Sequence, residues 1–252
     1  MSERTAERPS DRRRRGVRGI RRTARIVGSV LLAASLAVPL TAVAEDPSAI
    51  PDEGPLAWRL EREDDGISVY TRRVEDSPHR AVKATMRLTT PIAPLVALVK
   101  DTDACAEWAA FCKRAFVAEA ASETEAWIYT HNDMPWPVTD RDAVSHVRWY
   151  HDAGSGAVWM DSVAAPEHLP REKGRVRLEA AVTSWRFTPV GEGVVEITTQ
   201  AHVDPAGPVP AWITNRLLVD APIETLRAMR DLLATGRYAD ASFAFLEADS
   251  SR

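Results

Sequence analysis

The most regular alternation of apolar and polar side chains lies near the C-terminal end of the chain. Apolar residues recur there at mostly three- and four-residue steps: Trp212, Ile213, Leu217, Val219, Ile223, Leu226, Met229 and Leu233. Charged residues largely fall between them, so the pattern predicts an amphipathic helix from Pro210 to Leu233. Pro210 suits a first helical position, whereas Pro222 lies inside the run and predicts a kink or a joint between two segments.

Most of the chain before this helix is expected to form strands, several with the two-residue alternation of a half-buried sheet. The expected strands are 66–71, 79–89, 113–121, 124–131, 140–152, 157–164, 175–188 and 194–203. A short helix is expected around Trp58 and Leu60, and another begins at Pro91 and stops near residues 101–103. Since the long helix must bury its apolar stripe, the economical arrangement is an α+β fold in which a curved antiparallel sheet wraps around it.

The N-terminal segment has the composition of a secretory signal peptide. Ten arginines within the first 25 residues precede an apolar run of 15 residues, from Ile26 to Leu40, and an Ala-x-Ala exit that ends at Ala44. This predicts removal of residues 1–44 and a periplasmic or secreted protein, with the export route left open. The alternative is a membrane anchor, but the run is shorter than the roughly 20 residues that span a bilayer. Residues 45–56 are polar and rich in proline, and are expected to form a linker.

Removal of this leader makes the protein acidic. Of 32 basic and 36 acidic residues, 22 and 33 remain, a formal charge of −11. Such a surface has no electrostatic footprint for nucleic acid and is repelled by anionic lipid. Any contact with a membrane must therefore be apolar in origin.

The two cysteines, Cys105 and Cys112, are seven residues apart. On one continuous helix their Cα atoms would be about 10 Å apart, too far for a disulfide. They therefore form either a disulfide, if the helix breaks between them, or two buried free thiols.

Four motifs occur in a characteristic order. They are PWPVTDRD at 135–142, PREKGRVR at 170–177, WRFTP at 185–189 and DPAGPVPAWITN at 204–215. Over residues 58–235 the sequence thereby resembles a START domain, the lipid-transfer family related to the steroidogenic acute regulatory protein, and it looks like an exported bacterial member.

The resemblance implies a START-like lipid-binding domain over residues 57–236 and a C-terminal tail over residues 237–252. In this family the helix-grip fold encloses a tunnel for one lipid between the curved sheet and the last helix. The loop Ala165–Gly174 and that helix would form the gate. The resemblance also implies a monomer that binds a lipid ligand, contacts membranes transiently and needs no cofactor.

The strand that begins at Arg141 sets the expected cavity face. Ala143, Ser145, Val147 and Trp149 share one face, and Val144, His146, Arg148 and Tyr150 share the other. If the first face lines the tunnel, Val147 occupies the position of an arginine found in many family members, and His131 on the neighbouring strand occupies that of a carboxylate. A tunnel with so few charges favours a sterol-like or acyl lipid over a zwitterionic phospholipid. The expected ligand-binding residues are Trp127, Tyr129, His131, Ser145, Val147, Trp149, Trp159, Leu217, Ile223, Leu226 and Met229.

Two functions from different classes fit this pattern. The first is a carrier that binds one apolar lipid and transfers it between membranes. The second is an enzyme, since helix-grip relatives include cyclases and hydrolases that act on apolar substrates. An enzyme needs a buried acid–base pair, and only His131 is a candidate for one. The histidines and Asp133 form no three-ligand pattern, so neither a catalytic nor a metal site is predicted.

Overall fold

The computed structural model describes residues 56–207 and 209–247, which belong to one compact unit. The predicted signal peptide and residues 45–55 of the predicted linker lie outside the described residues.

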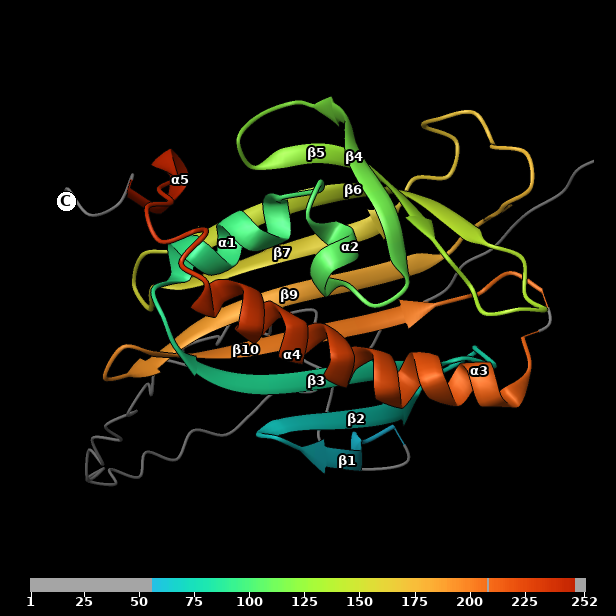
Figure 1. The fold of residues 1–252 in the computed structure, drawn as a ribbon, viewed down its shortest axis with the longest axis horizontal. Helices are drawn as coiled ribbons and strands as arrows, with labels where there is room; N and C mark the ends of the chain where they lie inside the picture. The colour runs from blue at the N-terminus through green and yellow to red at the C-terminus, as the bar shows by residue number, and fades with distance from the viewer. Residues whose placement is uncertain (1–55, 208, 248–252) are drawn as a thin grey trace, which may run out of the picture. The chain divides into compact units, whose positions relative to one another are not determined.

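A ten-stranded sheet forms the body of this unit (Figure 1). The strands are β1 (Arg59–Asp64), β2 (Ile67–Arg73), β3 (Arg80–Thr89), β4 (Cys112–Ala120), β5 (Glu125–Asn132), β6 (Arg141–Asp152), β7 (Ala157–Ala164), β8 (Val176–Arg177), β9 (Ala181–Gly191) and β10 (Val194–Val203). Nine of them pair antiparallel in the order β1-β2-β3-β10-β9-β7-β6-β5-β4, and the short β8 pairs parallel with β6. The predicted curved antiparallel sheet is confirmed.

The helices lie against one face of the sheet. They are α1 (Ile92–Lys100), α2 (Cys105–Trp108), α3 (Ala211–Asn215), a π-helical turn η1 (Arg216–Asp220), α4 (Ala221–Ala234) and the short α5 (Ala244–Glu247). Figure 1 shows α1, α2 and α4 in front of the same face, and their buried side chains belong to one core cluster with that face. We call this the helix-covered face and the opposite one the outer face.

The strand register shows which side chains share the helix-covered face. Ile67, Met86, Ile197, Phe187 and Val158 are cross-strand partners in a row through β2, β3, β10, β9 and β7. Partners in register point to the same face of a sheet, and all five are nearly fully buried. This row therefore forms the floor beneath the helices.

The predicted C-terminal helix has a joint where Pro222 falls. Proline lacks the N–H that an α-helix needs for its ladder. The turn before it is π-helical, and the N–H of Ala221 bonds to the carbonyl of Arg216 five residues back. The wider turn ends just before Pro222 and is the joint between α3 and α4 within one continuous helical run.

Two predicted elements are wrong. The segment around Trp58 and Leu60 enters the edge strand β1 instead of a helix. Its side chains are mostly exposed, so it shows no apolar period that would distinguish the two. The predicted strand 175–188 is interrupted, because Val176 and Arg177 pair with β6 before the chain crosses to β9 at Ala181.

The two cysteines form a disulfide, with Cα atoms 5.8 Å apart. The helix that contains Cys105 ends at Trp108, which is the break that the bond requires. The bond ties α2 to the first residue of β4.

The described part of the predicted C-terminal tail packs on the domain. Tyr238, Phe243 and Phe245 lie against the core cluster. The Tyr238 hydroxyl donates a hydrogen bond of 2.9 Å to Asp101 at the end of α1.

Candidate functional site

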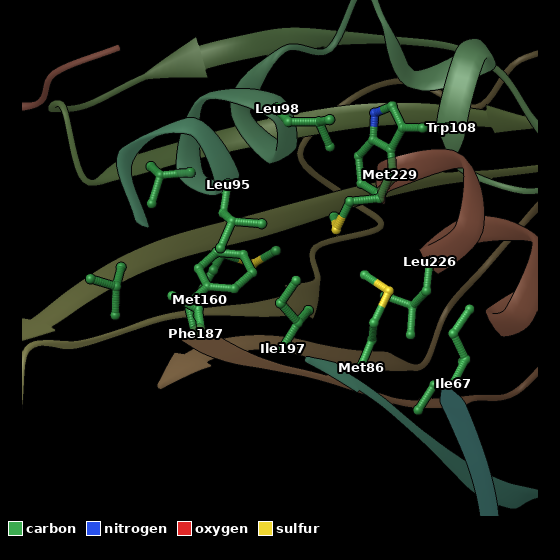
Figure 2. Close-up of a cluster of buried hydrophobic side chains, with 14 of the residues drawn as sticks. Ile67, Met86, Leu95, Leu98, Trp108, Met160, Phe187, Ile197, Leu226 and Met229 are labelled. Atoms are coloured by element: carbon green, nitrogen blue, oxygen red, sulfur yellow. The ribbon is translucent and has the colours of Figure 1, made fainter. Parts of the chain in front are cut away.

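One half of the space between the sheet and the helices is filled. Phe187, Ile197, Met86 and Ile67 rise from the strands, and Leu226 and Met229 of α4 descend toward them in Figure 2. Leu95 and Leu98 of α1 and Trp108 of α2 close this half from the side. Apart from Trp108, which is 8% exposed, these side chains are at most 2% exposed.

The other half contains a partly open cavity of about 820 Å³. Its floor is the helix-covered face at the opposite ends of the same strands, with Thr71, Val82, Thr183 and Ala201. Its roof is η1 and the start of α4, which contribute Leu217, Leu218, Val219, Ala221 and Thr225. Ala110 and Phe111, inside the disulfide-closed loop, form part of the wall.

A decrease in side-chain size along the strands produces the hollow. On β9 the helix-covered face carries the large rings of Phe187 and Trp185 and then the small Thr183, and on β10 it changes from Ile197 through Thr199 to Ala201. The short side chains leave a space beneath η1 and the start of α4 that the side chains of this roof do not fill. The cavity therefore lies where the register of neighbouring strands brings these short side chains together.

Of the expected ligand-binding residues on the helix side, one lines this cavity. Leu217 is in its wall. Ile223, Leu226 and Met229 of α4 belong to the packed cluster, as do Val147 and Trp149. Ser145 shares the face of Val147 without being among the described wall residues. Contact of any of these residues with a lipid stays a prediction.

The expectation that Trp127, Tyr129 and His131 point into the cavity is wrong. In register, Trp127 pairs with His146, Tyr129 with Val144, and His131 with Asp142. Cross-strand partners share a face, so all three lie on the outer face of the sheet. Trp127 is stacked there between His146 and His168, at centroid distances of 4.4 and 4.7 Å.

Trp159 also lies on the outer face, contrary to expectation. It pairs with Tyr150, and their rings stack 5.3 Å apart. The same register places Arg148 outside, where its guanidinium lies 3.1 Å from Glu125. The predicted faces of the strand at 141–152 are thus confirmed from Val147 to Tyr150, but its neighbours were given the wrong faces.

The loop Ala165–Gly174, expected to form a gate, is fastened to the outer face. Arg177 donates two hydrogen bonds, of 3.1 and 2.9 Å, to Asp142, and both side chains are 1% exposed. The same guanidinium donates to the carbonyls of Pro166, Leu169 and Pro170. A buried ion pair therefore holds this loop on the side of the sheet away from the cavity.

Polar groups that the sequence did not single out complete the cavity wall. Glu61 and Arg80 pair at 3.2 Å, and the Thr71 hydroxyl donates to Glu61. Arg141 and Asn132 are cross-strand partners that both line the cavity. Arg141 is adjacent to Asp142 in a motif that looks purely structural. Only the alternation of strand faces could have indicated that Arg141 lines the cavity while Asp142 lies on the outer face.

A second groove of about 570 Å³ adjoins the first and shares Arg141 with it. Pro137 and Val138 line it on one side, and Val209 and Pro210 on the other. Two exposed tryptophans flank these segments. Trp136, before Pro137, is 89% exposed, and Trp212, just after Pro210, is 51% exposed.

Over 56–207 and 209–247, no helix is both long and apolar enough to cross a bilayer. The same residues contain no group of three or more side chains placed to hold a metal ion.

An antiparallel sheet closed by a C-terminal helix over a cavity defines the helix-grip class of proteins. The START domain family model matches residues 51–238, and the chain belongs to this family. An uncharacterized protein of Pseudomonas aeruginosa is 35% identical over 202 residues, which cover 80% of this chain and 94% of that protein. START domain-containing protein 10 of Mus musculus is 26% identical over 167 residues, 65% of this chain and 57% of that protein.

Solved structures agree with this fold. A fragment of the STAR-related lipid transfer protein of Xanthomonas axonopodis is 35% identical, with a TM-score of 0.65 over 70% of this chain and 98% of that one. Human StAR-related lipid transfer protein 5 has a TM-score of 0.64 at 15% identity, over 71% of this chain and 87% of that one, and shows the fold alone.

Proposed function

We propose that this protein binds a single apolar lipid in the cavity beneath η1 and transfers it between membranes. The cavity carries the proposal, since about 820 Å³ lies within the range of about 300–1,000 Å³ typical of small-molecule sites. The bacterial relative at 35% identity whose structure is known is named a lipid transfer protein.

The physical requirement for such a carrier is small. Each methylene group moved from water into an apolar site contributes about 0.8 kcal/mol, so an acyl chain needs only space and apolar walls. Val82, Ala201 and Leu217 supply apolar surface here. We propose an acyl or sterol-like lipid as the ligand, because this apolar surface suits a hydrocarbon chain or ring system.

Membrane contact is proposed through the two exposed tryptophans. Indole rings favour the interface between water and hydrocarbon, because they combine a large apolar surface with one polar N–H. Trp136 and Trp212 flank the groove that meets the cavity at Arg141. With a formal charge of −11 after loss of the leader, the protein would bind a membrane through such apolar contacts.

A periplasmic or secreted location is part of the proposal, together with cleavage after Ala44. The disulfide between Cys105 and Cys112 supports it, because such bonds persist in oxidising compartments. We propose that the carrier acts as a monomer and does not bind nucleic acid.

The enzyme alternative is weaker than the carrier. Its one acid–base candidate, His131, lies on the outer face and bonds to Asp140 at 2.7 Å. His79 is in the cavity wall, 3.4 Å from Asp204, but both side chains are at least a third exposed. Catalytic acid–base pairs are usually enclosed in a site that excludes water, whereas this pair is open to solvent.

Extraction of the purified protein and mass spectrometry of the extract test the proposal. One lipid in stoichiometric amount supports a carrier, a mixture of substrate and product supports the enzyme, and an empty cavity after purification from a lipid-rich host contradicts both.

Transfer is tested separately with a fluorescent acyl lipid moving between neutral phosphatidylcholine vesicles. We expect Trp136→Ala and Trp212→Ala each to slow transfer about tenfold, as losing one aromatic contact removes on the order of 1–2 kcal/mol. Lipid binding itself should be unchanged. Trp159→Ala, which removes an outer-face tryptophan away from the groove, is the matched control. Equal rates in all variants would argue against contact through the groove.

A further inference from the structure

The charged groups of the cavity wall are unequally neutralised. Glu61 and Arg80 compensate each other at 3.2 Å, and Thr71 donates a hydrogen bond of 2.6 Å to the same carboxylate. His79 faces Asp204 at 3.4 Å. Among the described wall residues that leaves Arg141 as the formal charge without a counter-ion.

Arg141 is 6% exposed, and its described partners are all backbone carbonyls. Its Nε donates to Pro205 at 3.2 Å and its Nη1 donates to Thr139 at 2.6 Å. Its Nη2 has no hydrogen-bond partner within the described part of the chain. The desolvated cation is costly to the fold, and burial lowers the pKa of its guanidinium.

The carboxylates adjacent in sequence cannot neutralise Arg141, because they point to the outer face. Asp140 accepts from the N–H of Met134 and bonds to His131, and Asp142 is held by Arg177. Arg177 makes an instructive contrast. It is equally buried, yet it has two hydrogen bonds to a carboxylate and three to carbonyls. Within the described residues, the fold therefore supplies a carboxylate to Arg177 on β8 and none to Arg141 on β6.

Asn132 and the unpaired Nη2 of Arg141 together form a small polar site in the cavity wall. It is the cross-strand partner of Arg141, shares its face and also lines the cavity. Its side chain makes no hydrogen bond to the described residues. Its amide adds two donors beside the free Nη2, where the cavity meets the groove between the exposed tryptophans.

We infer that the ligand is a single-chain lipid with a carboxylate head, bound with the head on Arg141 and Asn132 and the chain in the cavity. This inference rests on the proposed lipid-binding function and names the chemical class of the ligand. A carboxylate neutralises the buried guanidinium, and hydrogen bonds between charged partners are the strong ones. A sterol hydroxyl would leave the charge uncompensated. A zwitterionic head would bring a cation for which the only carboxylate of the described wall, Glu61, is already engaged.

The test compares palmitate with hexadecanol, which have the same chain length and differ in the charge of the head. Binding of each radiolabelled ligand, below its aggregation limit, is measured with the full-length protein by equilibrium dialysis. Wild type is expected to bind palmitate about tenfold more tightly or better. Arg141→Met should abolish this preference, because palmitate loses its counter-ion while hexadecanol has no charge to lose. Asn132→Leu should reduce the preference by a smaller factor.

Arg148→Met is the matched control, since it removes an arginine from the outer face of the same strand and should keep the full preference. If circular dichroism shows that Arg141→Met is unfolded, Arg141→Lys and Asn132→Leu carry the test, and both must lower the preference. Equal wild-type affinities for palmitate and hexadecanol, or a preference that survives Arg141→Met, would overturn the carboxylate assignment while lipid binding stands. Hexadecyl phosphate that displaces palmitate at lower concentration would also overturn it. Failure to bind any of these ligands would contradict the proposed function itself.

Discussion

The two halves of the helix-covered face are built on the same strands and differ in what stands on them. On β9, Phe187 meets α1 and α4 in a packed core, whereas Thr183 four residues earlier faces the cavity. The filled half stabilises the protein through apolar burial, and the hollow half forgoes that burial to keep a site open. If the hollow half binds the ligand as proposed, stability and binding occupy separate parts of one sheet, and each should be alterable without the other.

The largest expected effect is on the free energy of unfolding, when one side chain is truncated in each half. Phe187→Ala should lower the free energy of unfolding by about 3–5 kcal/mol, because a fully buried aromatic side chain leaves a cavity behind. Thr183→Ala, on the same strand and face, should cost less than about 1 kcal/mol. Denaturant titration of both variants measures this, and similar losses would show that the cavity wall is as important to stability as the core.

The disulfide joins the halves, since its loop carries Trp108 of the core and Phe111 of the cavity wall. Replacing both cysteines by serine should lower the free energy of unfolding by about 2–4 kcal/mol, mainly by freeing the unfolded chain. It should also weaken lipid binding, because the wall at Phe111 loses its anchor. Thermal unfolding and ligand titration of the double variant test both effects. Unchanged binding would confine the role of the bond to stability.

Adding volume should produce opposite results in the two halves. Ala201→Phe fills the cavity, so it should block lipid binding and change the free energy of unfolding by less than about 1 kcal/mol. Ala84→Phe is the matched control in the packed half and should destabilise by about 1–3 kcal/mol. Lipid extraction and denaturant titration distinguish them. Normal lipid content in Ala201→Phe would place the ligand elsewhere.

The smallest expected effect concerns the C-terminal segment that packs on the filled half. Burial and the hydrogen bond to Asp101 raise the pKa of Tyr238 to about 12, above its usual value of about 10. Because the folded-state pKa is the higher one, this contribution is complete below about pH 10 and is lost as the pH rises through 12. Tyr238→Phe should therefore be less stable by about 1 kcal/mol at pH 8.

The gap between wild type and Tyr238→Phe should narrow steadily from about pH 10 and be mostly lost by about pH 12. Urea titrations of both proteins from pH 8 to 12 measure it. A gap that stays constant over this range would mean that the hydroxyl contributes through packing and not through its bond to Asp101.

The faces of β5 illustrate where prediction from sequence stopped. Tyr129 and His131 are 1% and 6% exposed, as expected for residues inside a tunnel. They are buried instead by segments on the outer face, where Tyr129 stacks on Phe116 and accepts a hydrogen bond from Arg175. When both faces of a strand are covered, the burial of its side chains does not show which face lines the cavity. Only its pairing with β6 decides this.

Apolar periodicity along the chain determined the antiparallel sheet, the long C-terminal helix with its joint at Pro222, and the inner face of β6 from Val147 to Trp149. These are local properties, because a strand or helix with one covered side repeats its apolar residues at a fixed step. The tertiary structure alone decided that Arg141 and Asn132 meet at the cavity, that Arg177 fastens the loop at 165–174 to the outer face, and that one half of the interior is hollow. Each of these depends on residues distant in sequence being brought together, and the distance between their side chains is set by strand register and packing, which no single segment encodes.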